Sequence, residues 1–512
     1  MTPPEATTTA TTPVANEAPS GPVTSRKRTL LGLVLSALSG LMLFVMCDGH
    51  GSLWPLVIVA FVPMYVAQYR LLSRRMSGLA VGIAFFGYWL SLFTYSGSLA
   101  TYVGGPVGGA LIILVVSIIF SIPMWIFGIF ERPFAERTRY KWLIVQLPLF
   151  WVALETVFGS NLLFGDNYWL AYRLAPAPSL AQPVSILSTP ALSFLLIMFN
   201  AGVALLIFKW IDRRWSGLAT VAIPARTVKW SSIIAFGVTI VWIGSSLAIY
   251  WQVNSQLGPQ VRVAAAQTGN ENRSPMGERA EQGTPGEIAR NQRLRTQLER
   301  MTRSAVTQGA QLVVWPEEIL EYDVTTQEGH WVGELAKSTN TTIVAGYKPL
   351  SPSEASPNMA AAWLPSGEIL TPPYYKIHPV VLEGEKFKTP HLFPTYETPV
   401  GQLGLLICFD HDFPNSSARL DTLGGADILA VPAIDFASIR DLRWQTLTFR
   451  AIENRVPLIK ADVAWDSAIV NANGDLAKRV AIADVDGAEA LLVTDVNRGP
   501  RNSIFTVTGG YA

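Results

Sequence analysis

The chain has 512 residues, of which 50% are hydrophobic and 15% are charged, against about 25% charged residues in a typical soluble domain. The high apolar content and the presence of only 2 cysteines exclude a disordered chain and a disulfide-stapled scaffold. Charge is divided unevenly, because residues 1–250 hold 16 Lys and Arg against 8 Asp and Glu, whereas residues 251–512 hold 23 against 30. Neither half has a dense basic patch outside short loops, so we expect no nucleic-acid partner.

The first half of the chain has the pattern of a membrane domain. Residues 1–25 predict a disordered tail, because they are rich in Thr, Pro and Ala and have no apolar period. Residues 26–252 predict a transmembrane helical domain of about seven spans, each near the ~20 residues that cross ~30 Å of hydrocarbon as a helix. The seven apolar stretches are Thr29–Cys47, Leu53–Tyr69, Gly78–Tyr95, Pro106–Phe130, Trp142–Phe158, Ile186–Phe208 and Ser231–Tyr250.

The loops between these stretches predict the orientation in the membrane. Alternate loops contain nearly all the cations, and the three intervening loops contain only Arg173. Because Lys and Arg concentrate on the cytoplasmic side, the N-terminus should be cytoplasmic and everything after Tyr250 should lie outside. Glu155, near the outer end of the fifth stretch, should snorkel to the interface. The cytoplasmic cations would be Arg26, Lys27, Arg28, Arg70, Arg74, Arg75, Arg132, Arg137, Arg139, Lys141, Lys209, Arg213, Arg214, Arg226 and Lys229.

Residues 258–500 predict a soluble α/β domain, followed by a C-terminal tail over residues 501–512. Short apolar runs alternate there with amphipathic stretches, a pattern that indicates a sheet covered by helices. The expected strands are Val261–Gln267, Leu312–Trp315, Thr342–Gly346, Gly404–Cys408, Ala426–Val431 and Leu458–Val463. The expected helices are Glu287–Gln308, Trp331–Lys337 and Leu442–Asn454.

Three motifs with chemically active side chains stand at or near the ends of predicted strands. They are Trp315-Pro316-Glu317-Glu318, the segment from Tyr374 to Glu385, and Ile407-Cys408-Phe409-Asp410. A cysteine nucleophile needs a base to take its proton and a positive group to hold the oxyanion, and a carboxylate and a lysine can serve in these two roles. A Cys–His dyad using His378 or His411 is a rival, although it lacks a clear orienting Asn or Asp.

The order of the motifs WPE, YxKxH and ICFD resembles the Glu–Lys–Cys triad of the nitrilase, or carbon–nitrogen hydrolase, superfamily. The strand Val261–Gln267 and the segment Arg450–Arg455 are also similar to that family. The resemblance implies a four-layer αββα sandwich. It also implies that Glu317 is the general base, that Lys376 stabilises the oxyanion and that Cys408 is the nucleophile.

The same resemblance implies supporting residues around the triad. The backbone N–H of Phe409 would be a second oxyanion donor, and Asp410 would be a further supporting residue next to it. Glu385 would be a further active-site glutamate, with Glu383 as the alternative because the register is offset by one residue.

A nitrilase-like domain preceded by a multi-helix domain resembles the apolipoprotein N-acyltransferase family, as does the outer loop Phe164–Gln182. This resemblance implies that an acyl chain passes from a phospholipid to the cysteine and then to the N-terminal amine of a diacylglyceryl-cysteine lipoprotein. The partners would be the phospholipid, the lipoprotein and the bilayer of the bacterial inner membrane. No cofactor or metal is expected, because the thioester itself stores the acyl group.

Two departures from the acyltransferase pattern keep an alternative open. The usual Cys-Tyr-Glu is Cys408-Phe409-Asp410 here, and we find no transmembrane stretch after Val493 where the family has a last helix. The alternative is a membrane-tethered carbon–nitrogen hydrolase that uses the same triad on a small soluble amide, because a shared triad sets the covalent chemistry and not the acceptor.

Overall fold

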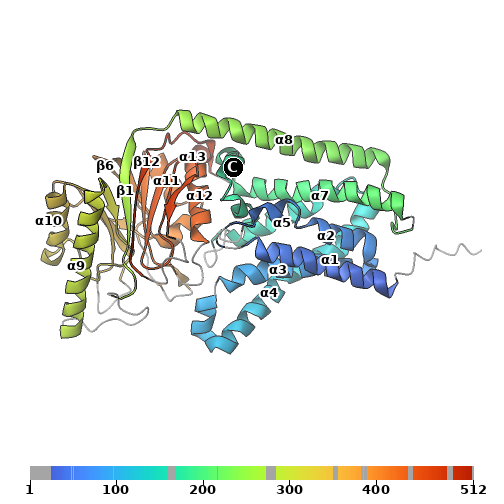
Figure 1. Ribbon diagram of the computed structural model, residues 1–512, viewed down its shortest axis with the longest axis horizontal. Coiled ribbons are helices and arrows are strands. Elements are labelled where there is room, and N and C mark those ends of the chain that lie inside the picture. The colour runs from blue at the N-terminus through green and yellow to red at the C-terminus, as the bar shows by residue number, and fades with distance from the viewer. Residues whose placement is uncertain are drawn as a thin grey trace, which may run out of the picture.

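The computed structural model describes residues 25–47, 49, 51–95, 97–159, 165–166, 169–215, 217–271, 284–349, 356–381, 385, 389–435, 442–480 and 488–509. The tail expected over residues 1–25 lies outside the described residues except for Ser25, and Glu383 also lies outside them. The described chain forms an elongated molecule, with a helical region at one end and an α/β domain at the other (Figure 1).

The helical region runs from Arg26 to Ser255, and its long helices lie roughly side by side (Figure 1). Its elements are α1 (Arg26–Val45), η1 (Trp54–Ile58), α2 (Val62–Val66), η2 (Ala67–Leu71), η3 (Arg74–Met76), α3 (Ser77–Thr94), α4 (Gly97–Arg137), α5 (Leu143–Gly159), η4 (Leu170–Leu174), η5 (Pro178–Leu180), α6 (Val184–Leu187), α7 (Thr189–Arg214) and α8 (Ala225–Ser255).

Six helical segments among the described residues are long and apolar enough to cross a membrane, and α5, with 17 residues, is apolar but shorter. The multi-pass helical domain is thereby confirmed. The number of spans, expected to be about seven, stays approximate. The second expected stretch is not one regular helix, because it divides into η1, α2 and η2, with prolines at positions 55 and 63 that have no amide hydrogen to donate.

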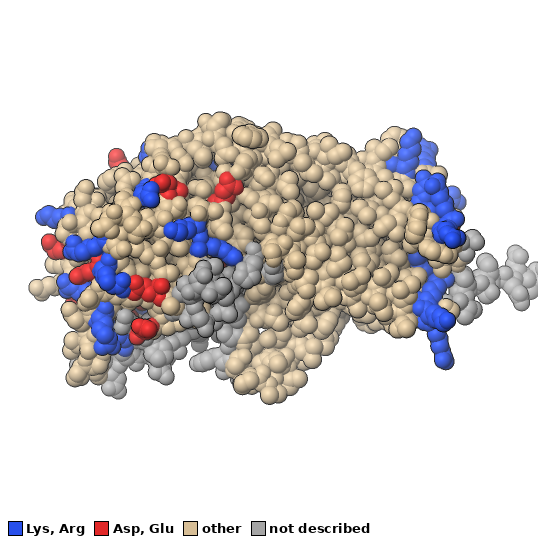
Figure 2. All heavy atoms as spheres, viewed as in Figure 1, with Lys and Arg blue, Asp and Glu red and all other residues tan. Residues whose placement is uncertain are grey.

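The surface charges follow this division of the molecule. Figure 2 shows Lys and Arg gathered at the end of the helical region that lies farthest from the α/β domain. On the face shown, a wide band without charged side chains separates them from the mixed Lys, Arg, Asp and Glu of the α/β domain (Figure 2). A hydrocarbon layer requires such a band, and the basic end matches the cytoplasmic loops expected from the sequence.

Glu155 corrects one expectation, because its carboxylate does not reach the interface. It is buried on α5 and accepts hydrogen bonds from Trp151 Nε1 at 2.7 Å, the Leu170 N–H at 2.6 Å and Ser193 Oγ at 3.1 Å. All three donors meet the Oε1 oxygen, so the carboxyl group is held inside the bundle rather than at the interface. Glu155 thereby ties η4 in the outer loop to the helical region.

The α/β domain contains two six-stranded sheets, ordered β12-β1-β2-β3-β4-β5 and β11-β10-β9-β8-β7-β6. The strands are β1 (Gln260–Gln267), β2 (Leu312–Val314), β3 (Thr342–Tyr347), β4 (Met359–Trp363), β5 (Tyr374–Tyr375), β6 (Thr395–Thr398), β7 (Gly401–Leu405), β8 (Ile428–Ala433), β9 (Leu458–Asp462), β10 (Ala468–Val470), β11 (Leu476–Arg479) and β12 (Ala490–Asn497). In each sheet three neighbouring strands are parallel, β1-β2-β3 in the first and β7-β8-β9 in the second.

The two sheets pack face to face, with helices on both outer sides, so the αββα sandwich is confirmed. Helices α9 (Pro285–Thr307) and α10 (His330–Thr339) cover the sheet farther from the helical region (Figure 1). Helices α11 (Ser417–Leu423) and α12 (Arg443–Asn454) cover the other sheet and stand between it and the helical region. The six strands that the sequence pattern did not predict are β4, β5, β6, β10, β11 and β12.

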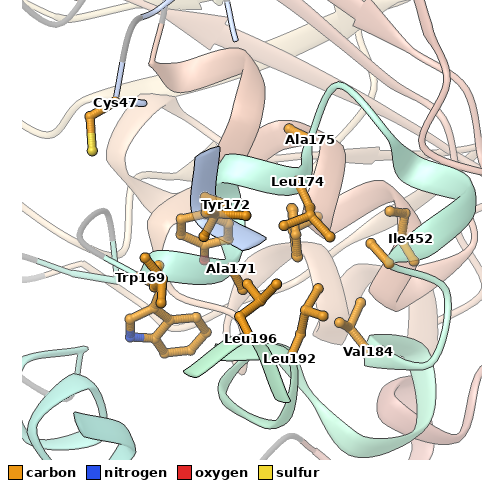
Figure 3. Packing of buried hydrophobic residues seen from close by; sticks show 14 of the residues in the cluster. Cys47, Trp169, Ala171, Tyr172, Leu174, Ala175, Val184, Leu192, Leu196 and Ile452 are labelled. Atoms are coloured by element: carbon orange, nitrogen blue, oxygen red, sulfur yellow. The ribbon is translucent and has the colours of Figure 1, made fainter. Parts of the chain in front are cut away.

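The contact between the two parts is a continuous apolar core rather than a hinge. Ile452 on α12 lies among Leu174, Val184 and Leu192 of the helical region (Figure 3). Every residue of α12 is buried, because one side of the helix covers a sheet and the other faces the helical region. Residues 501–509, expected to be a tail, include the short helix α13 (Ile504–Thr508), which contacts α6, α11 and α12.

Candidate active site

Cys408 stands in a tight turn beyond the end of β7. The residues Cys408–Asp412 form one short 3₁₀ segment. Cys408 has φ 43°, a left-handed backbone conformation that is rare for residues other than glycine. The expected strand Gly404–Cys408 therefore ends earlier, at Leu405. The Cys408 Sγ is buried and lies 3.5 Å from the Ile434 carbonyl oxygen and 3.9 Å from Asp435 Oδ1.

Glu317 and Lys376 come together beside this turn from the other sheet. Glu317 follows β2 and Lys376 follows β5, and their side chains form a buried ion pair with Nζ and Oε1 2.9 Å apart. Lys376 Nζ also lies 2.9 Å from Glu385 Oε2. Asn358 Nδ2 donates to Glu317 Oε1 at 2.6 Å. The structure thus places one lysine between two carboxylates, with an amide fixing the orientation of Glu317.

Burial is the main cause of the pKa shifts in this cluster. It raises the pKa of Glu317, and the nearby Glu385 carboxylate adds to that effect. Burial alone would lower the pKa of Lys376, but the carboxylates of Glu317 and Glu385 outweigh it and hold that pKa well above its usual value. Burial would raise the pKa of Glu385, but Lys376 and the Val380 N–H hold it lower. A proton can therefore be accepted more readily by Glu317 than by Glu385.

Burial is also the main influence on the pKa of the Cys408 thiol. Burial raises the pKa of Cys408 well above its usual value, the charges of Glu317 and Asp435 raise it further, and Lys376 and Arg443 oppose them. Thiolate, rather than thiol, is the nucleophile, so a base must take the proton as the bond to substrate forms. Glu317, whose pKa is raised, is suited to that role.

Asp410 joins the turn to the segment that carries Lys376. Its Oδ1 accepts hydrogen bonds from the Ile377 N–H at 3.1 Å and the His378 N–H at 2.9 Å, and its Oδ2 accepts from Tyr374 Oη at 2.8 Å and the Ile407 N–H at 3.2 Å. These bonds occupy both oxygens of a fully buried carboxylate. Asp410 therefore acts on the site through the backbone around Lys376.

The two histidines of the rival dyad have their own partners. His378 Nδ1 lies 2.9 Å from Asp410 Oδ1, so an orienting carboxylate that the sequence did not reveal is present. His411 Nδ1 is hydrogen-bonded to the Cys408 carbonyl oxygen, and burial lowers the pKa of this imidazole well below its usual value. His411 thus supports the backbone of the turn as a neutral ring.

Sequence reasoning missed a second buried cluster on the other side of the thiol. Asp435, after β8, is bound by Lys460 and lies 3.3 Å from Arg443 Nε. Arg443 also binds Asp412, at the end of the Cys408–Asp412 turn. Burial alone would raise the pKa of Asp435, but these two cations outweigh it and hold that pKa low, so Asp435 stays ionised. The sequence feature that could have revealed this cluster is the presence of ionisable residues at the ends of otherwise apolar strands.

Phe409, proposed as an oxyanion donor, is buried in the turn, and its ring packs edge-on against Phe413 at 5.1 Å between centroids. Glu385 meets Lys376, whereas the alternative Glu383 lies outside the described residues. Within the part of the chain that the structure describes, no group of three or more His, Cys, Asp and Glu side chains is arranged to hold a metal ion.

Two family models match this chain in succession. Residues 39–202 match the apolipoprotein N-acyltransferase N-terminal domain, and residues 263–499 match carbon–nitrogen hydrolase. The chain is also 24% identical to an apolipoprotein N-acyltransferase from Geobacter metallireducens, over 93% of this chain and 91% of the relative.

Other relatives match smaller parts of this chain. A probable nitrilase from Schizosaccharomyces pombe is 40% identical over 90 residues, which span 17% of this chain and 32% of that protein. An amidase structure from Nesterenkonia sp. is 21% identical with a TM-score of 0.38, and the match covers 46% of this chain and 90% of the amidase. The apolipoprotein N-acyltransferase therefore matches nearly the whole of this chain, whereas the probable nitrilase matches a small part of it.

Proposed function

We propose that this chain, which belongs to the apolipoprotein N-acyltransferase family, uses Cys408 to move an acyl chain from a phospholipid to the N-terminal amine of a diacylglyceryl-cysteine lipoprotein. The two successive domain matches and the full-length relative support lipoprotein N-acylation in general. The observation that carries the finer proposal is the buried Glu317–Lys376 pair, whose charges both act on the Cys408 thiol.

In the first half of the proposed reaction, Glu317 takes the proton of the thiol while the sulfur attacks the ester carbonyl of the phospholipid. Lys376 and the Phe409 N–H stabilise the oxyanion that develops. The carbon–oxygen ester bond then breaks, and Glu317 returns its proton to the departing lysophospholipid oxygen. The product of this half is an acyl thioester on Cys408.

In the second half, the free amine of the acceptor attacks the thioester carbonyl. Glu317 takes a proton from the attacking nitrogen, and the carbon–sulfur bond breaks to release the thiolate. The proton then returns to the sulfur, so the enzyme ends as it began and the acceptor carries a new amide. No external energy source is needed, since the ester and the thioester supply the acyl group.

The helical region supports a multi-pass protein of the bacterial inner membrane. We propose that its basic end faces the cytoplasm and that the α/β domain lies on the periplasmic side (Figure 2). This orientation brings Cys408 to the outer leaflet, where a phospholipid chain could reach it. The phospholipid and the lipoprotein are the proposed partners, together with the bilayer itself.

The test is intact mass spectrometry of the purified full-length protein after incubation with phospholipid vesicles, beside a Cys408→Ser variant. We expect a mass increase equal to one acyl chain, which hydroxylamine removes and which the variant lacks. Adding a synthetic diacylated lipopeptide should then discharge the adduct onto the peptide amine.

The second candidate is a membrane-tethered amidase, supported by the match of residues 263–499 to carbon–nitrogen hydrolase and by the similarity to a probable nitrilase. The same experiment separates the two. A thiol that is alkylated readily but never acquires a lipid adduct, together with release of ammonia from a small amide, would contradict acyl transfer and support the amidase.

A further inference from the structure

The outer loop of the helical region presses against the turn that carries Cys408. The Asp166 N–H donates a hydrogen bond to the Asp412 carbonyl oxygen at 3.1 Å. At Gly165 (φ 55°), a Cβ would stand 2.9 Å from the Asp412 Cβ and 3.5 Å from the Phe409 ring. Only glycine permits this approach, so the membrane part of the chain forms one wall of the nucleophile turn.

The Asp166 side chain continues this contact into a buried ion cluster. It lies 3.2 Å from Arg450 Nη1 on α12 and accepts a hydrogen bond from Tyr172. Arg450 also lies 3.0 Å from Glu453 Oε2, and Glu453 Oε1 accepts from Thr189 Oγ1 at the start of α7. The ionisable side chains of this cluster are buried, so it joins the two parts of the molecule at a position that water does not screen.

Helix α12 completes a closed ring around the turn. Arg443 and Arg450 are seven residues apart and therefore lie on the same face of this helix. Arg443 binds the Asp412 side chain, and Arg450 binds Asp166, whose own N–H binds the Asp412 backbone. The nucleophile turn is thus held from one side by the catalytic domain and from the other by the loop of the helical region.

We propose that Asp166 is a positioning residue, through which docking of the membrane part onto α12 sets the geometry of the Cys408 turn. The proposal rests on the nucleophilic role of Cys408. Asp166 touches no reacting atom in this scheme and acts through Asp412, beside the close approach of Gly165 to Phe409. A turn displaced by about 1 Å can slow a reaction about 100-fold without weakening substrate binding, because alignment of the reacting atoms is lost.

The test compares Asp166→Asn, Arg450→Gln and the double variant in full-length protein reconstituted with phospholipid. We expect Asp166→Asn to slow acyl-enzyme formation about 10- to 100-fold in kcat, while KM for phospholipid changes less than about twofold. The double variant should lose no more than the poorer single variant, because both changes break the same link. Peptide mapping after iodoacetamide treatment should show that the rate of Cys408 alkylation in these variants also differs from the wild-type rate.

The matched control is Gln182→Ala. Gln182 Nε2 donates to the Asn473 carbonyl oxygen at 2.8 Å across the same interface, but Gln182 is not in the ring around the turn. This variant should lose stability without a change in kcat. Gly165→Ala supplies a second probe, since it forces the loop away from Asp412 without replacing any ionisable side chain. This variant should slow acylation too.

Equal kcat in wild type and Asp166→Asn, or a loss in Gln182→Ala as large as in Asp166→Asn, would overturn the proposal. If wild-type Cys408 is alkylated but never acylated, the proposed acyl transfer fails, and the alkylation rates of the variants still decide the role of Asp166. If wild-type Cys408 reacts with neither reagent, its nucleophilic role and this inference fail together.

Discussion

Two buried clusters in this chain share one pattern, a cation between two acidic side chains, but differ in the cation and in their surroundings. The active-site cluster consists of Glu317, Lys376 and Glu385, and the interface cluster consists of Asp166, Arg450 and Glu453. The first acts electrostatically on a thiol, whereas the second joins two parts of the molecule. The pattern of charges alone therefore does not distinguish a candidate catalytic cluster from one that joins two parts of the molecule.

The cation accounts for part of the difference. Lys376 is a compact charge, which can serve both carboxylates and still present a donor toward developing negative charge. Arg450 is a planar fork that reaches Asp166, Glu453 and Tyr172 at once. Burial raises the pKa of Asp166 to about 8, so the interface cluster shares its one cation between two carboxyl groups that do not both ionise readily.

The largest expected effect is at the active-site cluster. Glu317→Gln removes the base that takes the thiol proton, so acyl-enzyme formation should fall about 10²- to 10⁴-fold. Folding should be preserved because the amide keeps the shape of the side chain. Single-turnover kinetics with phospholipid measure the loss, and Glu318→Gln is the control at the neighbouring position. Full activity in Glu317→Gln would remove Glu317 from the proposed mechanism.

A comparable change at the interface should act on stability instead. Arg450→Met leaves two buried carboxyl groups without their cation, and the free energy of unfolding should fall by about 3–5 kcal/mol. Arg262→Met is the control, since its exposed pair with Asp495 should contribute at most about 1 kcal/mol. Thermal unfolding in detergent checks both variants. Equal melting temperatures for the two would show that the interface cluster is not a stabilising link.

A smaller effect is expected from Asp410, where the chain departs from the family pattern. Asp410→Glu adds a methylene to a buried carboxylate whose oxygens are already bonded, so the segment around Lys376 should shift. Acylation should slow about tenfold, near the lower end of what misalignment costs. Rates at saturating phospholipid measure this effect. If Asp410→Glu is faster than wild type, the shorter acid is not required by the geometry of this site.

The smallest expected effect is a shift in the pH profile of Cys408 alkylation. In the wild type the rate should still rise above about pH 8.5, the usual thiol pKa, because burial and the Glu317 carboxylate raise the pKa of Cys408. Glu317→Gln removes a negative charge that opposes the thiolate, so its profile should move to lower pH. Lys376→Met removes a cation that favours the thiolate, so its profile should move to higher pH.

Iodoacetamide rates between pH 6 and 11 test the direction of both shifts. Lys348→Met provides a neighbouring cation as control, because Lys348 pairs with Glu318 and is not among the charges found to act on the thiol. Shifts in the same direction for Glu317→Gln and Lys376→Met would contradict the opposed effects of the two charges.

The sequence by itself determined the division of the chain and much of its secondary structure. Apolar runs with alternating basic loops indicated the helical region, because the bilayer imposes a length and a charge rule that need no tertiary information. Buried parallel strands such as β2 and β8 were predicted because they are continuous apolar runs. Short or more polar strands such as β5 and β11 lack that signal, because pairing with a neighbour decides them.

For the site, the motifs and a family resemblance indicated Glu317, Lys376 and Cys408. Their separation along the sequence cannot show whether these residues touch one another. The tertiary structure alone decided that Glu317 and Lys376 pair and that Asp410 orients the lysine segment. It also decided that Asp166 meets Arg450 across 284 positions of the chain. Such pairs form because burial leaves an ionised group no water to bind, and only the folded chain determines which opposite charge lies within reach.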